Sequence, residues 1–162
     1  MKRMMFVAAL AVLTASSGWS QTGIPKSNPL AKSIPGTVKK CNRGNLPCEI
    51  SITVKPGAGD TCIASVDIET VKIRKNLPFA FVLFASAADP ARYTFYGQGI
   101  IWEGTPPGAD VFEFVGLTNG DTAAAWQTKS KRSASFAYRP TVKRSDGVNC
   151  DGADPKIAND GS

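Results

Sequence analysis

The chain has 162 residues, of which 43% are hydrophobic and 20% charged, and its formal net charge is +6. This length and hydrophobic content predict one globular domain. The sequence contains no histidine, which removes the usual general base, the commonest metal ligand and the Ser-His or Cys-His nucleophile pairs. We therefore expect a protein that is not an enzyme and that holds no metal and no cofactor.

The N-terminus has the features of a secretory signal peptide. Lys2 and Arg3 precede an apolar run over residues 4–13, and small residues follow this run. The run is shorter than the about 20 residues that a helix needs to cross a bilayer. We expect cleavage after Ser20, which lowers the net charge of +6 by two and leaves a mature chain with no membrane span. The alternative is a buried helix or an uncleaved anchor. The favoured interpretation predicts a periplasmic or secreted protein.

Residues 21–40 are rich in Pro, Ser, Lys and Gly and hold few large apolar side chains. This composition predicts a flexible basic arm that leads into a single domain over residues 41–162. The arm carries Lys26, Lys32, Lys39 and Lys40 and no acidic residue. A solvated leader is favoured over a binding tail, because runs of like charge are usually solvated.

Residues 48–55 and 62–68 each alternate apolar and polar side chains, as half-buried strands do. The intervening Pro-Gly-Ala-Gly-Asp segment, residues 56–60, predicts a turn and therefore a β-hairpin. In the expected register Val54 lies near Cys62, and Cys48 lies near Ile68.

Four cysteines in an exported chain predict two disulfides. In the expected hairpin Cys48 and Cys62 lie roughly 20 Å apart, at about 3.4 Å per residue, whereas a bridge requires Cα atoms within about 7 Å. The hairpin therefore excludes a Cys48–Cys62 bridge. We favour a short Cys41–Cys48 loop together with a long Cys62–Cys150 loop.

Further short strands are predicted between Gly- and Pro-rich turns, over residues 71–74, 79–84, 93–102, 111–115, 122–128 and 134–144. The segment 93–102 is one strand interrupted near Gly97, or two short strands. Residues 79–84 are apolar on both faces, which predicts a strand covered on both sides or, less favoured, one face left for a ligand. Residues 122–128 and 134–144 are expected to form a final hairpin. These patterns predict an all-β fold, an antiparallel β-sandwich of about seven or eight short strands that is loosely immunoglobulin-like.

Basic residues gather on the expected final hairpin, and no acidic residue stands between Asp121 and Asp146. Arg139 and Lys143 share a face of their strand, because their separation is even. Cations next to aromatic rings suit an anionic polymer, whereas the favoured alternative is an edge hairpin that charge keeps from pairing with other chains. The candidate binding residues are Lys129, Lys131, Arg132, Arg139, Lys143, Arg144, Trp126 and Tyr138.

Two ends of the chain carry a resemblance. Residues 48–54 read Cys-x-Ile-x-Ile-x-Val, residues 138–142 read Tyr-Arg-Pro-Thr-Val, and residues 154–160 read Asp-Pro-Lys-Ile-Ala-Asn-Asp. This layout resembles a group of small uncharacterised exported proteobacterial proteins that end in a tyrosine-containing strand followed by Asp-Pro-x-Ile-x-Asn. The resemblance implies a secreted β-sandwich and supplies no activity or site. Pro140 departs from it and indicates an edge position or a bulge, because proline cannot donate to a strand ladder.

We expect from these patterns an exported, non-enzymatic binding or structural module of the cell envelope. Its partner would be an envelope protein or an anionic polysaccharide, contacted through the basic C-terminal hairpin, and not a nucleic acid. The alternative is a small secreted hydrolase or enzyme inhibitor with its site in the loops of residues 85–108.

Overall fold

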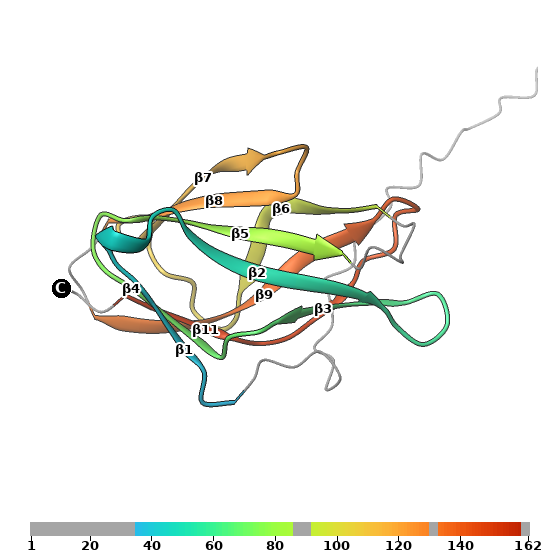
Figure 1. Ribbon diagram of the computed structural model, residues 1–162, viewed down its shortest axis with the longest axis horizontal. Coiled ribbons are helices and arrows are strands. Elements are labelled where there is room, and N and C mark those ends of the chain that lie inside the picture. Colours follow the sequence, from blue (N-terminus) through green and yellow to red (C-terminus); the bar gives the residue numbers. More distant parts are fainter. Residues whose placement is uncertain (1–34, 86–91, 130–132, 160–162) are drawn as a thin grey trace, which may run out of the picture.

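The structure, a computed structural model, describes residues 35–85, 92–129 and 133–159 as strands in two sheets with one short 3-10 helix (Figure 1). The five-stranded sheet has the order β1 (Val38–Cys41), β4 (Thr70–Ile73), β11 (Lys156–Asn159), β9 (Ala134–Arg144), β6 (Tyr93–Trp102). The six-stranded sheet has the order β10 (Asp151–Gly152), β3 (Cys62–Val66), β2 (Cys48–Pro56), β5 (Pro78–Ala85), β8 (Ala123–Thr128), β7 (Phe112–Thr118). The 3-10 helix η1 (Arg43–Asn45) connects β1 to β2. No helix in the described ranges is long and apolar enough to cross a membrane.

The prediction of an all-β fold is confirmed, but the structure has eleven strands instead of seven or eight. The additional strands are β1, β10 and β11, which are two to four residues long. Strands this short show little of the period-two alternation on which the prediction rests. β1 takes up the last residues of the predicted arm, from Val38 to Lys40.

The first predicted hairpin is present as β2 and β3, which pair antiparallel. Pro56 lies opposite Cys62 and Val54 opposite Ala64, so the register differs from the expected one by two residues. The turn is tighter than expected, because the backbone N–H of Gly57 donates to the carbonyl of Thr61 at 2.9 Å.

The sheets are mixed, whereas an antiparallel arrangement was predicted. β1 and β11 both run parallel to β4, β2 runs parallel to β5, and β10 runs parallel to β3. The cause is that the chain changes sheet at most connections. Among the described strands, only β2–β3 and β7–β8 are sequence neighbours in one sheet.

β9 is not an edge strand, because it lies between β11 and β6. Pro140 is tolerated since β11 pairs only with residues 134–137, and the ladder to β6 is irregular next to it, between Phe95 and Ile100. The expectation of a bulge at Pro140 is thus correct and that of an edge is wrong. Residues 93–102 were expected to form either one interrupted strand or two short ones. They form one strand, with a bulge at Gly97–Gly99.

Aromatic side chains from both sheets meet in the core. Phe81 of β5 contacts Tyr138 of β9 with ring centroids 5.0 Å apart, and Trp102 of β6 stacks on Phe112 of β7 at 5.4 Å. The opposite side of β5 is less covered than predicted: Ala80 and Val82 are half-buried, and Phe84 is 49% exposed.

Both predicted disulfides are present. Cys41–Cys48 links β1 of the five-stranded sheet to β2 of the six-stranded sheet, and Cys62–Cys150 links β3 to the segment that precedes β10. All four cysteines are at most 1% exposed. The structure describes no free cysteine.

Candidate functional site

The predicted final hairpin does not form. β8 pairs with β5 and β7, whereas β9 pairs with β6 and β11 in the other sheet. Trp126 and Tyr138 are only 3% and 0% exposed, because rings of this size gain most when they are packed in the core. The prediction that these two side chains flank the basic residues on the surface is therefore wrong.

Two of the predicted cations are paired with acidic residues from distant parts of the chain. Arg139 donates through Nε to Asp154 at 2.8 Å and through Nη2 to Glu103. Burial raises the pKa of Glu103; Arg139 opposes this shift, and the nearby Asp154 reinforces it. Lys129 forms an ion pair with Glu113 at 2.5 Å. The side chain of Arg139 is only 14% exposed. Its ion pairs therefore connect parts of the fold, and little of its charge is open to a ligand.

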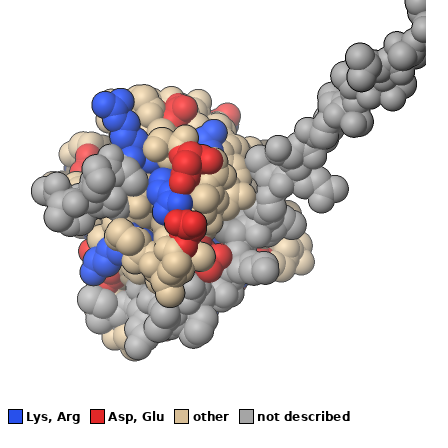
Figure 2. Space-filling view, turned by 90° about the vertical axis from the view of Figure 1, so that its right-hand side faces the viewer, with Lys and Arg blue, Asp and Glu red and all other residues tan. Residues whose placement is uncertain are grey.

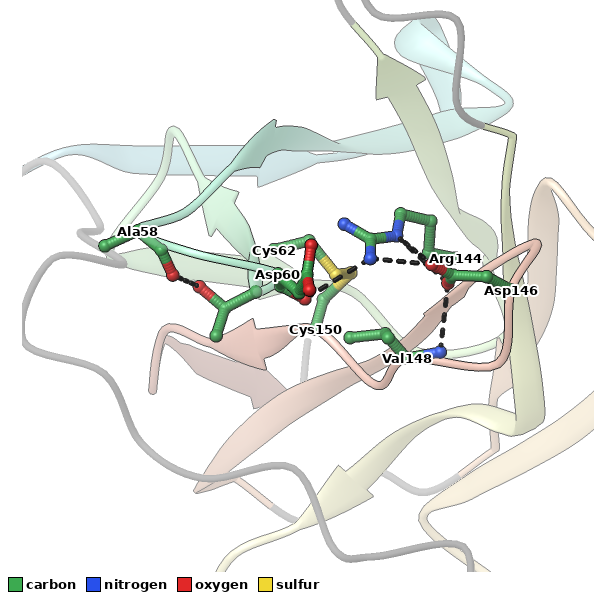
Figure 3. The surroundings of a disulfide bond; sticks show 8 residues. Ala58, Asp60, Cys62, Arg144, Asp146, Val148 and Cys150 are labelled. Atoms are coloured by element: carbon green, nitrogen blue, oxygen red, sulfur yellow. Dashed lines mark hydrogen bonds and ion pairs between the residues drawn. A yellow bond between two sulfur atoms is a disulfide. The ribbon is translucent and has the colours of Figure 1, made fainter.

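The end of the molecule where β9 finishes carries acidic and basic side chains next to each other (Figure 2). There Arg144 lies close to the Cys62–Cys150 disulfide and faces Asp146 (Figure 3). Its Nη2 contacts Asp146 at 2.6 Å and the carbonyl of Asp60 at 3.3 Å. The hydrogen bond between the two side chains raises the pKa of Arg144 and lowers that of Asp146. This end is therefore of mixed charge.

Of the three remaining predicted cations, the structure describes only one. Lys131 and Arg132 lie outside the described residues, and Lys143 is exposed on β9. The loops of the alternative site lie partly outside the described residues too, at 86–91. The part of the structure that is described holds no cluster of three or more His, Cys, Asp or Glu side chains that could bind a metal.

A basic surface that the sequence did not predict lies at the end of β1 and β4, on the left of Figure 1. A hollow of about 510 Å³ opens there, and a second one of about 300 Å³ shares Arg43 and Arg74 with it. We call the two together the basic hollow. Its cationic lining residues are Lys40, Arg43, Lys72, Arg74 and Lys75.

Local structure brings these five side chains together. Lys40 lies directly beside Lys72, because β1 and β4 pair in parallel at this position. Arg43 is the first residue of η1, which Asn42 caps through a capping box and which lies between the two half-cystines of Cys41–Cys48.

The chain after β4 is held by a residue of β8. Thr128, which is fully buried, donates through its hydroxyl to the carbonyl of Arg74 at 2.6 Å and accepts from the N–H of Leu77 at 3.0 Å. This fixes the turn that carries Arg74 and Lys75.

Among the described residues, nothing compensates the charge of the basic hollow. No acidic side chain of residues 35–85, 92–129 and 133–159 lines it, and none of the ion pairs in these ranges involves its five cations. Like charges directly opposite each other on neighbouring strands destabilise a sheet, so the Lys40–Lys72 pair costs stability. Four of the five residues are exposed, and Lys75 is half-buried. This arrangement can bind carboxylate, sulfate or phosphate groups by charge-assisted hydrogen bonds.

Part of the basic hollow had a signal in the sequence. Lys72 and Arg74 have the even spacing that puts two side chains on one face of a strand, and no acidic residue stands among residues 38–48. The parallel pairing of β1 with β4 joins the two segments, and no local pattern predicts it.

No protein-family model matches the chain, and a search of curated proteins found no match.

Proposed function

We propose that the protein is an exported, non-enzymatic binding module of the cell envelope that holds an anionic polysaccharide in the basic hollow. The observation that carries this proposal is the convergence of five cations on hollows whose described lining holds no acidic residue. An anionic polysaccharide is one of the two partners expected from the sequence, the other being an envelope protein, but the proposed site lies at the end of β1 and β4 instead of at β8 and β9.

A polysaccharide with acidic groups suits the shape and the chemistry of this site. The larger hollow has the about 300–1,000 Å³ that is typical of sites for small ligands, which is room for a sugar ring that bears a carboxylate. Arg43 and Arg74 offer planar guanidinium groups for bidentate contact with such a group, and Lys40 and Lys72 add point charges.

We further infer that the two sheets form a β-sandwich, loosely immunoglobulin-like, in the periplasm or outside the cell. The ring contact between Phe81 and Tyr138, which belong to different sheets, supports face-to-face packing. The two disulfides support an oxidising compartment. The signal-peptide pattern and the resemblance to small exported proteobacterial proteins agree with this placement.

The test is binding of polygalacturonate to the purified protein, with neutral dextran as the comparison polymer. Because counterions are released when cations meet a polyanion, affinity should fall steeply between about 50 and 200 mM salt. The double variant Lys72→Gln/Arg74→Gln should bind at least about tenfold more weakly, since two charge-assisted contacts are lost.

The matched control is Lys55→Gln/Arg92→Gln, which removes the same charge from two exposed residues outside the basic hollow. It should change the affinity by less than about twofold, because exposed charges at a distance are screened. An equal loss of affinity in both double variants would mean that binding depends on the net charge of the protein and not on the basic hollow. No binding at low salt would refute the proposal.

A further inference from the structure

Another hollow, of about 360 Å³, is lined mainly by aromatic rings and prolines. We call it the aromatic hollow, and it shares no lining residue with the basic hollow. Its walls come from β6, the loop after β6, β7 and β8. The lining residues are Gln98, Trp102, Pro106, Pro107, Ala109, Phe112, Glu113, Phe114 and Trp126.

The aromatic hollow forms where the edge strands of the two sheets, β6 and β7, approach each other. Gly99 also lets β6 come close to β8: it has a φ of +80°, and a Cβ there would lie 2.4 Å from the Cβ of Ala124 on β8. Any larger residue would push β6 away from β8. The bulge around Gly99 leaves Gln98 exposed at the hollow.

The rings of the aromatic hollow are held by one another. Trp102 stacks on Phe112 and meets the edge of Trp126 at 5.6 Å, and Phe114 contacts Trp126 at 5.3 Å. Trp102 and Phe114 are only half-buried, so each keeps part of its ring open. Trp126 is 97% buried, and its indole N–H has no hydrogen-bond partner among the described residues. Buried donors normally have a partner.

We propose that the aromatic hollow binds one ring of a neutral carbohydrate. The C–H groups of a sugar ring carry a small positive charge that the negative face of an aromatic ring attracts. Sugar hydroxyls both donate and accept hydrogen bonds. They can therefore serve the carboxylate of Glu113 and the amide of Gln98 together.

Glu113 decides against the other ligands that aromatic hollows take. A carboxylate only accepts hydrogen bonds, so a proline-rich peptide, which offers carbonyls and few N–H groups, would give it no hydrogen bond beyond its contact with Lys129. An anion would be repelled. A cationic ligand would compete with Lys129, which already contacts Glu113 at 2.5 Å. A neutral polyol can join this ion pair without breaking it.

The test follows the indole N–H signals of Trp102 and Trp126 in ¹⁵N NMR spectra of the purified protein. The probes are neutral trisaccharides of glucose, galactose, mannose and N-acetylglucosamine, each added up to about 10 mM, which detects millimolar affinity. We expect at least one of them to shift both signals. Gln98→Ala and Glu113→Gln should each weaken its binding by about threefold to tenfold, which is the effect of one lost hydrogen bond.

Glu49→Gln is the matched control, because Glu49 is exposed on β2 outside the aromatic hollow. This variant should bind the trisaccharide with the same affinity as the unaltered protein. Three results would overturn the proposal: no shift with any neutral trisaccharide, unchanged affinity in both hollow variants, or shifts with a proline-rich peptide or trigalacturonate alone. Because the basic hollow is probed separately with a polyanion, either proposal can fail without the other.

Discussion

Tyr138 places a phenol in the middle of the core, where it is 0% exposed. Its hydroxyl has no hydrogen-bond partner among the described residues, and burial raises the pKa of the phenol. An unpaired buried hydroxyl costs roughly 1–3 kcal/mol, while the ring itself gains from its contact with Phe81. The aromatic contact of Tyr138 therefore stabilises the fold, and its unpaired hydroxyl destabilises it.

We expect Tyr138→Phe to raise the free energy of unfolding by about 1 kcal/mol, because the substitution keeps the ring and removes the unpaired hydroxyl. Urea unfolding should show a higher midpoint with an unchanged slope. A lower midpoint would mean that the hydroxyl has a hydrogen-bond partner in solution and that the phenol contributes more than its ring.

Arg139 shows why a count of charges along the chain failed to locate the basic surface. The sequence has no acidic residue within seventeen positions before Arg139, yet folding places Glu103 and Asp154 against its guanidinium. Room for this side chain comes from Gly152, where a Cβ would lie 2.6 Å from the Cγ of Arg139. Neither the two carboxylates nor the glycine stands near Arg139 in the sequence, so only the fold reveals that this cation is compensated.

At the scale of the elements, β11 is the strand that completes the five-stranded sheet. It lies between β4, with which it pairs parallel, and β9, with which it pairs antiparallel. Without it the β1–β4 pair would have no connection to β9 and β6 within that sheet. Ile157 is its largest fully buried side chain, and Asn159 is 1% exposed.

Ile157→Ala should therefore lower the free energy of unfolding by about 2–5 kcal/mol, the usual cost of removing this much buried side chain from a core. Lys156→Ala is the control on the same strand, because Lys156 is exposed, and it should change stability by less than about 0.5 kcal/mol. Denaturant unfolding of the two variants distinguishes these outcomes. A loss below about 1 kcal/mol for Ile157→Ala would show that β11 adds little to the sheet.

The strands that the sequence predicts and those that it misses differ in their length and in their pattern of apolar residues. β2, β3 and β5 alternate or run apolar over five to nine residues, and the sequence predicts each of them. β11 has a single large apolar residue, Ile157, so it lacks the alternation by which a half-buried strand is predicted. The wrong pairing of β8 with β9 has another cause. Sequence neighbours often form hairpins, but here the inward-facing Trp126 and Tyr138 belong to different sheets.

For the whole molecule, the two disulfides have different places in the fold: Cys41–Cys48 joins the two sheets, and Cys62–Cys150 lies next to the pairing of β3 with β10. Cys62–Cys150 closes a loop with a sequence separation of 88 residues, and Cys41–Cys48 closes one of 7. The long loop encloses every strand from β4 to β9. In the chain-entropy account, a bridge stabilises by restricting the unfolded chain, and the restriction grows with the logarithm of loop length. The long bridge should thus contribute more to stability than the short one.

This predicts an ordered pair of losses. Cys62→Ala/Cys150→Ala should lower the free energy of unfolding by about 4–5 kcal/mol, and Cys41→Ala/Cys48→Ala by about 2.5 kcal/mol. Burial does not distinguish the two substitutions, because all four cysteines are equally buried, so the difference isolates loop length. Urea unfolding of the oxidised proteins measures both losses. Equal losses, or a larger loss for the short bridge, would show that the native contacts around Cys41 and Cys48, which carry Arg43 into the basic hollow, outweigh the entropy of the chain.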